Sequence, residues 1–189
     1  EPHYIEIERL APFQARGTEV PVVLDLMVHD IDLILEMVDS PIQNIGASGA
    51  KMMSETIDLA HAHIKFENGA VANLKSSRIA QNYVRKIKTY QKNLYSITDL
   101  MIPQTELYGL ENNNKFSSDA KTQLIKTQSG EKTLYYEKFI PKNNDALLEE
   151  INDFVRSINL RSNPIVDGQA GLNALKIALE IENKIFLNE

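Results

Sequence analysis

Residues 21–38, PVVLDLMVHDIDLILEMV, have the pattern of a helix that is apolar on nearly every side. Such a helix is buried on most of its surface. Pro21 suits its first turn, Thr18 is the predicted N-cap, and Pro41 prevents the helix from continuing. The rest of the chain is therefore expected to pack around this segment.

The middle of the chain carries strand sequences that are separated by turns. The clearest hairpin joins 59–66 to 71–77. Asn68-Gly69 at its tip favours a type I′ turn, in which both central residues have positive φ. Further strands are predicted at 3–10, 42–51, 84–91, 94–98, 123–127 and 133–140, with a polar loop at 112–118 and a turn at Ser129-Gly130.

Helical spacing of apolar residues returns at 145–160 and 170–187, so two helices close the chain. The chain has 189 residues, of which 43% are hydrophobic, and this supplies a core for one domain. We therefore predict a single α+β domain over 1–189. Its predicted architecture is an open, mainly antiparallel β-sheet with helices packed on one face.

Composition excludes several classes of protein. The net charge of −6 argues against a nucleic-acid-binding surface, and the absence of cysteine excludes disulfides and thiolate metal sites. No apolar run reaches the roughly 18 residues that span a bilayer. We expect a soluble, cytoplasmic protein without a nucleic-acid or membrane partner. The chain begins at Glu1 and enters strand sequence at once, which suggests a piece of a longer protein.

The polar residues of the apolar helix form a pattern of their own. Asp25, His29, Asp32 and Glu36 are spaced at i, i+4, i+7 and i+11, whereas Asp30 falls outside this series. At about 100° per residue the four form one narrow stripe along the helix. A helix that is otherwise buried thus presents carboxylates and an imidazole in one direction.

Three interpretations of this stripe stay open at the level of the residues. It is the solvated edge of a core helix, or it faces a cleft in which Asp25 orients His29 for proton exchange with a substrate hydroxyl. The third interpretation is a divalent metal held by Asp25, His29 and Asp32, whose remaining ligands the sequence does not identify.

The segment VVLDLMVHDIDLIL resembles the signature helix of the glucose-fructose oxidoreductase, inositol dehydrogenase and MocA (Gfo/Idh/MocA) family. Asp25, His29 and Asp32 match the D-x-x-x-H-x-x-D pattern of that helix. The resemblance continues through IKFENGAVANLKSSR, RKIKTYQKNLYSITDL and the tail EEINDFVRSINLRSNPIVDGQAGLNALKIALEIENK, in the family's order. Glu19-Val20-Pro21 and Asn93 stand where the family usually has glycine, which loosens the subfamily assignment.

The resemblance implies the C-terminal, substrate-binding and oligomerisation half of an oxidoreductase that uses NAD or NADP. The family's N-terminal Rossmann domain is absent from this chain, since neither its glycine-rich fingerprint nor its Glu-Lys-Pro segment occurs. The residues that bind the cofactor are therefore unknown, and the fragment alone is expected to be inactive. In the full-length protein, His29 would take the hydroxyl proton of a sugar. Asp25 would support His29 or contact the sugar, and Asp32 would bind substrate.

Two arginines suit a charged substrate. Arg9 and Arg16 flank the segment ERLAPFQARG, and their guanidinium groups match a phosphorylated or nucleotide-linked sugar. Surface ion pairing with nearby glutamates is the alternative. This segment and the signature helix are similar to the subgroup that oxidises the 3-hydroxyl of UDP-N-acetylglucosamine, which implies a UDP-sugar substrate and NAD.

Other readings compete with the enzyme. A non-catalytic dimerisation or sugar-sensing module would keep the fold without the chemistry, and a free-standing metal enzyme would bind metal in this chain alone. His61 and His63 share one strand face, where an exposed or subunit-contact surface is the favoured interpretation over a metal pair. An open sheet with helices on one side leaves another face uncovered, so we expect a homodimer or homotetramer through the sheet.

Overall fold

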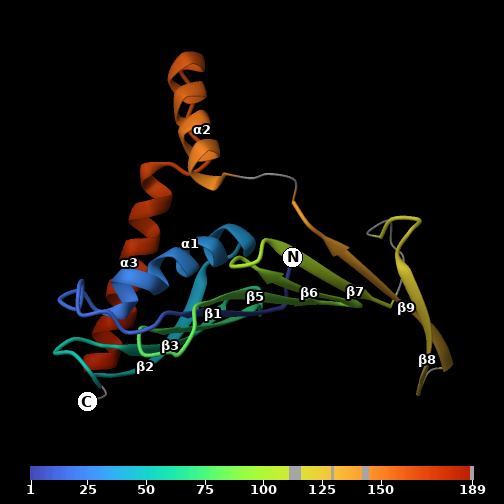
Figure 1. Cartoon of the computed structure of the whole chain (residues 1–189), viewed down its shortest axis with the longest axis horizontal. Coiled ribbons are helices and arrows are strands. Elements are labelled where there is room, and N and C mark those ends of the chain that lie inside the picture. Colours follow the sequence, from blue (N-terminus) through green and yellow to red (C-terminus); the bar gives the residue numbers. More distant parts are fainter. Residues whose placement is uncertain (111–115, 129, 142–144, 188–189) are drawn as a thin grey trace.

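A computed structural model describes residues 1–110, 116–128, 130–141 and 145–187. Within them lies a nine-stranded sheet of order β2-β3-β4-β1-β5-β6-β7-β9-β8 (Figure 1). Among these strands β1 and β4 pair in parallel, and the other neighbours pair antiparallel. The strands are β1 (Tyr4–Leu10), β2 (Ile42–Ala50), β3 (Leu59–Phe66), β4 (Val71–Ser77), β5 (Val84–Gln91), β6 (Leu94–Asp99), β7 (Gln104–Gly109), β8 (Lys121–Thr127) and β9 (Gly130–Phe139).

The helices follow the predicted segments closely. They are the π-helical turn η1 (Val23–Met27), which continues into α1 (Val28–Met37), then α2 (Ala146–Leu160) and α3 (Gly168–Phe186). Part of the polar loop predicted at 112–118, and Ser129 of the predicted turn, lie outside the described residues.

The core lies between one face of the sheet and the helices η1, α1 and α3 (Figure 1). Strand β3 alternates buried and exposed residues, as a strand with one covered face should. The helices bury Met27, Ile31 and Ile34 from η1 and α1, and Ala178 and Ile181 from α3. The predicted α+β class and the mainly antiparallel sheet are confirmed.

One of the two closing helices does not pack as predicted. α2 stands away from the sheet and from α1 (Figure 1), and Ser157 is its buried residue. The prediction that the helices pack on one face is therefore wrong for α2, because its amphipathic sequence alone does not say which surface it covers.

The β3–β4 hairpin forms where predicted but with a different turn. Gly69 has a φ of 87°, while Asn68 is not among the residues of positive φ. The Gly69 N–H donates to the Phe66 carbonyl at 3.0 Å, and the Phe66 N–H donates to the Ala70 carbonyl at 2.9 Å. This is a three-residue loop with glycine in the left-handed region, so the type I′ prediction is wrong.

The loop before the helix is held by tertiary contacts rather than by a cap at Thr18. The Thr18 hydroxyl donates to the Ala15 carbonyl at 3.3 Å, so Thr18 does not act as the predicted N-cap. The helix instead begins where the Val22 N–H donates to the Ile57 carbonyl at 2.9 Å. A distant strand-end loop therefore decides where the helix starts.

Asp58 organises that distant loop from a fully buried position. Its carboxylate accepts hydrogen bonds from the N–H groups of Met52, Met53 and Ser54 at 2.8, 2.7 and 3.0 Å, and from the Ser54 hydroxyl at 2.6 Å. Burial acts to raise the pKa of Asp58, but these hydrogen bonds outweigh it and lower the pKa to about 2. The carboxylate is therefore ionised at neutral pH.

Arg78 joins the two loops. Its guanidinium donates to the carbonyls of Gly17, Val20 and Ile57, and its Nε lies 3.4 Å from the Asp58 carboxylate. Buried carbonyls outside a sheet or helix need such donors. One arginine thus connects the segment before η1 to the loop that follows β2.

A second buried ion pair ties α1 to the sheet. Arg9 of β1 donates from Nε to both oxygens of Asp30, at 3.0 and 2.9 Å, and from Nη2 to Oδ1 at 2.6 Å. The two residues are 9% and 1% exposed. Burial raises the pKa of Asp30, and Arg9 opposes that rise. Each charge therefore depends on the other for its compensation.

Replacing Arg9 should reveal this dependence. Arg9→Met leaves a buried carboxylate without its partner, and the free energy of unfolding should fall by about 3–5 kcal/mol near neutral pH. Without Arg9, the hydrogen bonds and positive charge that lower the pKa of Asp30 are lost. Burial then raises this pKa further. A carboxyl whose folded pKa lies above its unfolded value stabilises the fold while protonated, and loses that contribution as pH rises. The deficit relative to wild type should therefore shrink in acid, as urea titrations at about pH 7 and about pH 5 would measure.

The matched control is Lys75→Met, which removes the exposed ion pair between Lys75 and Glu8 at 3.0 Å. Its effect should stay below about 1 kcal/mol. The double variant Arg9→Met, Asp30→Leu should recover much of the lost stability, because it removes both charges. A deficit that is the same at both pH values would contradict this account.

Candidate active site

The polar stripe of the apolar helix lies on the surface as predicted. Asp25, His29 and Glu36 are exposed, and Asp32 is half-buried. The buried residues of the same helix turn toward the sheet, so the stripe points away from it. This placement agrees with a solvated edge and with a cleft wall.

The first turn of the helix, which carries Asp25, is π-helical. Within η1 the Val28 N–H donates to the Val23 carbonyl, five residues back. A π-turn rotates each residue by less than 100°, so Asp25 and His29 remain close to one turn apart on the same side of the helix. Neither side chain makes a hydrogen bond to another described residue. Both are therefore available to a ligand, and π-turns of this kind often occur at functional sites.

Asp30 connects the stripe to the interior. It follows His29 in sequence, is buried with Arg9, and interacts electrostatically with His29. The stripe therefore lies above a fixed ion pair that links the helix to β1. The buried pair restricts rotation of α1 and keeps His29 on the outer side.

The structure gives the two candidate arginines different surroundings. The guanidinium of Arg9 is bound to Asp30, which is neither the substrate contact nor the surface pairing with glutamates that the sequence suggested. We therefore treat Arg9 as a positioning residue. Arg16 is exposed in the loop before η1 and makes no hydrogen bond or ion pair to the described residues.

Arg85 is a further candidate residue that the sequence pattern did not single out. Arg85 of β5 is the cross-strand partner of Arg9 and acts electrostatically on Asp30, so it lies on the helix-covered side of the sheet. It is exposed there. The signal was present in the alternation of β5, since Arg85 lies two residues before the buried Ile87 and so shares its face.

The metal interpretation has no preformed site in the part of the chain that the structure describes. No three His, Asp or Glu side chains of that part come together closely enough to hold an ion. His61 and His63 lie exposed on β3, and the Nδ1 of His63 pairs with Asn73 Oδ1 at 2.8 Å.

Among the described residues, no helix is long and apolar enough to cross a membrane.

A family model matches the part of the chain that holds the site. Residues 11–92 match the GFO/IDH/MocA C-terminal domain. This range contains η1, α1, the β3–β4 hairpin and β5. The match therefore includes the helix that carries Asp25, His29 and Asp32.

Two curated relatives are dehydrogenases by name. The chain is 30% identical over 184 residues to the UDP-N-acetylglucosamine 3-dehydrogenase of Acidithiobacillus ferrooxidans, a match that covers 95% of this chain and 53% of that protein. It is 23% identical to the myo-inositol 2-dehydrogenase of Thermotoga maritima, covering 89% of this chain and 49% of that protein. The chain thus spans about half the length of these relatives.

Solved structures support the same placement. The chain superposes on UDP-N-acetylglucosamine 3-dehydrogenase GnnA from Acidithiobacillus ferrooxidans with a TM-score of 0.82 and 29% identity, over 97% of this chain and 55% of that one. An NAD-binding protein from Listeria innocua shares the fold at a TM-score of 0.74 and 19% identity, over 100% of this chain and 54% of that one. The predicted resemblance is confirmed: residues 11–92 match the GFO/IDH/MocA C-terminal domain, and the fold of the chain is that of the dehydrogenases it superposes on.

Proposed function

We propose that residues 1–189 are the substrate-binding and oligomerisation domain of an NAD(P)-dependent oxidoreductase that oxidises a sugar or nucleotide-sugar hydroxyl. The observation that supports this most is the exposed, unpaired Asp25–His29 stripe on a helix that is otherwise buried. The named activities of the relatives suggest the substrate class, and the 3-hydroxyl of UDP-N-acetylglucosamine is the specific candidate.

The N-termini of α2 and α3 do not offer a site for the dinucleotide. A pyrophosphate binds best at a helix N-terminus with free N–H groups. In this chain Asp145 and Asp167 cap the N-termini of α2 and α3 and accept hydrogen bonds from those N–H groups. We therefore assign NAD or NADP to a dinucleotide-binding half of the full-length protein outside this chain, and expect the 189-residue chain alone to be inactive.

Oxidation of an alcohol to a carbonyl removes a hydride and a proton. The proposed mechanism assigns the hydride to the dinucleotide-binding half and the proton to this chain. A bound nicotinamide would supply the acceptor for the hydride of the substrate carbon. His29 takes the hydroxyl proton as the C=O bond forms, which suits an imidazole at neutral pH. Asp25 lies close enough in sequence to stabilise the resulting imidazolium or hold a sugar hydroxyl. Asp32, half-buried further along α1, would hold another hydroxyl.

His29→Ala in the full-length protein should lower kcat by about 10²–10⁴-fold, because the hydroxyl proton loses its acceptor. Asp25→Asn should lower it less. The assay follows nicotinamide absorbance with a panel of sugars and UDP-sugars. The matched control is Glu36→Gln, an exposed residue of the same stripe that has no assigned role. Turnover that is unchanged in the His29 variant would refute the mechanism and favour the non-catalytic sensing module.

A nucleotide-linked substrate needs a cationic contact, and Arg16 is the exposed arginine that fits. Arg16→Ala should raise KM for UDP-sugars by on the order of ten-fold, since a hydrogen bond to a charged group contributes about 1.5–3 kcal/mol. KM for a sugar without phosphate should stay nearly the same. Arg85→Ala applies the same KM comparison to the exposed arginine of β5. Equal effects on charged and uncharged substrates would refute the contact.

We also propose that the domain self-associates through the face of the sheet opposite α1 and α3. Tyr4, Tyr90, Tyr95, Tyr108 and Tyr136 are cross-strand neighbours there. Their successive ring centroids are 5.6, 4.7, 5.8 and 5.0 Å apart. Burial, together with Tyr95 and Glu6, raises the pKa of Tyr90 to about 12. A neutral aromatic row beside paired charges is the composition of many protein interfaces.

Tyr95→Asp should therefore lower the oligomeric mass measured by sedimentation equilibrium, because it places a charge in the middle of the tyrosine row. Met52→Asp, at a position that is 64% exposed in the loop after β2, should leave the mass unchanged. Circular dichroism checks that both variants fold. An unchanged mass for Tyr95→Asp would exclude this face as the interface.

A further inference from the structure

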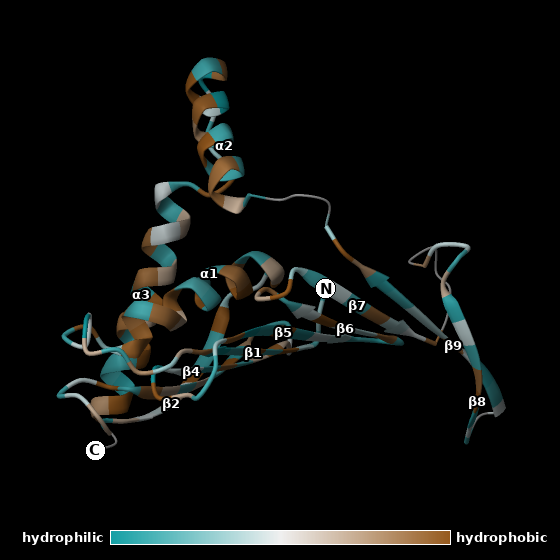
Figure 2. Cartoon of the chain, in the orientation of Figure 1, coloured by the Kyte–Doolittle hydropathy of each residue, from teal (hydrophilic) through white to brown (hydrophobic). Residues whose placement is uncertain are grey.

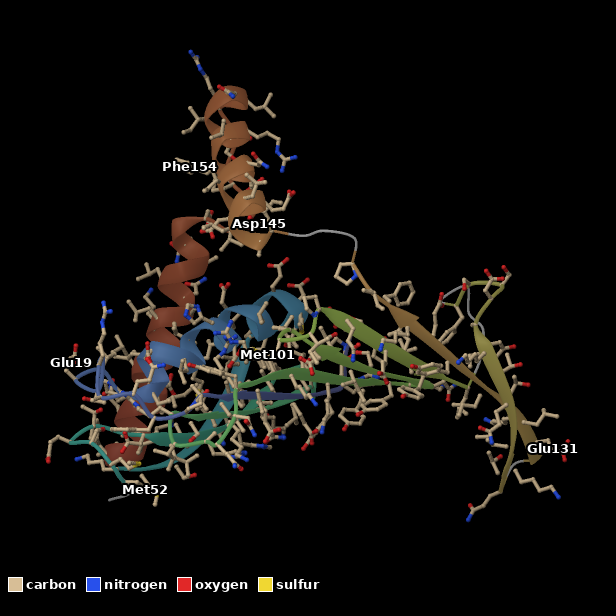
Figure 3. The ribbon with its side chains drawn as sticks, in the orientation of Figure 1. Glu19, Met52, Met101, Glu131, Asp145 and Phe154 are labelled. Atoms are coloured by element: carbon tan, nitrogen blue, oxygen red, sulfur yellow. The ribbon has the colours of Figure 1, made fainter. Side chains whose placement is uncertain are left out.

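α2 carries an apolar surface that no described part of the chain covers. Leu147, Leu148, Ile151, Phe154, Val155 and Ile158 recur at helical spacing and are each between 49% and 65% exposed. We call these six residues the α2 stripe. Figure 2 shows apolar residues along the helix, and Figure 3 shows Phe154 projecting with no helix or strand beyond it.

The helix itself is well built, so the exposed stripe is not the result of a frayed segment. Asp145 caps the N-terminus by accepting from the Leu148 N–H at 3.2 Å. At the other end Arg161 adopts a φ of 52°, and its N–H bonds to the carbonyls of Ser157 and Ile158. These are the usual devices that start and stop a helix.

The side of α2 that does have contacts is its polar side. The Asp153 carboxylate accepts from the N–H of Ile165 at 2.8 Å and from Arg156 at 2.7 Å, and the Ser157 hydroxyl donates to the Asp153 carbonyl. The turn to α3 is thereby held against this side. The α2 stripe is left facing outward, although an isolated amphipathic helix of this length gains little stability in water.

The position of α2 indicates what covers the stripe. α2 rises on the same side of the sheet as α1 (Figure 1), which carries His29. The relatives contain about as much chain again beyond the matched region, since the match covers 95% of this chain but 53% of the relative. A body placed over α1 to meet His29 would also lie beside α2. A second copy in that position would instead cover His29.

We propose that the α2 stripe docks onto the dinucleotide-binding half of the full-length protein and holds that half over α1. The proposal rests on the proposed function, because it needs that second half to exist. α2 then serves as a lateral contact that holds the dinucleotide-binding half in one position over α1. The tyrosine row on the opposite face of the sheet remains available for self-association.

The absence of cysteine from this chain allows single-site labelling. Ile151→Cys places a thiol in the α2 stripe, and Arg156→Cys places one on the polar side of the same helix. Each variant is prepared in the 189-residue chain and in the full-length gene product. Reaction with a maleimide is followed by peptide mass spectrometry, which separates these sites from any cysteine in the other half.

In the 189-residue chain both thiols should react at similar rates. In the full-length protein, labelling at position 151 should slow by on the order of ten-fold, while position 156 stays within about two-fold. Equal labelling at both positions in the full-length protein would overturn the proposal. Protection of position 151 that vanishes on dilution to monomer would also overturn it, since a second copy would then be the partner.

The labelling is independent of turnover, so it separates this proposal from the proposed catalytic role. With His29→Ala added, position 151 should stay protected in the full-length protein. Loss of protection in that background would count against docking, because His29 is not in the α2 stripe. Unchanged turnover combined with intact protection would refute the role of His29 and leave the docking surface supported.

Discussion

The bidentate contact between Arg9 and Asp30 decides how the main helix lies on the sheet. A helix that is apolar on most sides can rotate about its axis and still bury a comparable area, because hydrophobic contact has little directionality. A buried carboxylate is different, since it needs its cation at hydrogen-bond distance. With Asp30 held by a residue of β1, α1 has one favourable orientation. His29 and the carboxylates of the stripe are consequently directed outward.

The start of that helix depends on a second buried charge. Asp58 gathers three consecutive backbone N–H groups, and Arg78 bonds carbonyls from both loops that meet there. The N–H of Val22, at the start of the helix, therefore donates to the Ile57 carbonyl and not to a capping side chain. The π-helical turn that carries Asp25 begins directly after this junction. Charges far from Asp25 in sequence therefore fix where the helix that carries it begins.

The sheet separates two tasks onto its two faces. One face carries the helices and, through them, the exposed polar stripe, while the other presents a row of tyrosines in register. α2 packs on neither face of the sheet. It stands away from the sheet on the same side as α1, with its apolar stripe exposed. This arrangement agrees with the proposed function, in which the helix side meets a dinucleotide-binding half and the tyrosine row meets another copy of the chain.

The sequence by itself determined what local periodicity and turn chemistry decide. Helix and strand positions, the hairpin at 59–77 and the exposed stripe on the 21–38 helix follow from spacings of two and near four residues, because side-chain direction is a local property. The tertiary structure alone decided the partner of Arg9, the position of Arg85 beside it, the π-turn under Asp25 and the detachment of α2. Each of these features depends on which distant segments of the chain become neighbours. Whether a charge is buried, or an apolar face is covered, follows only once those neighbours are known.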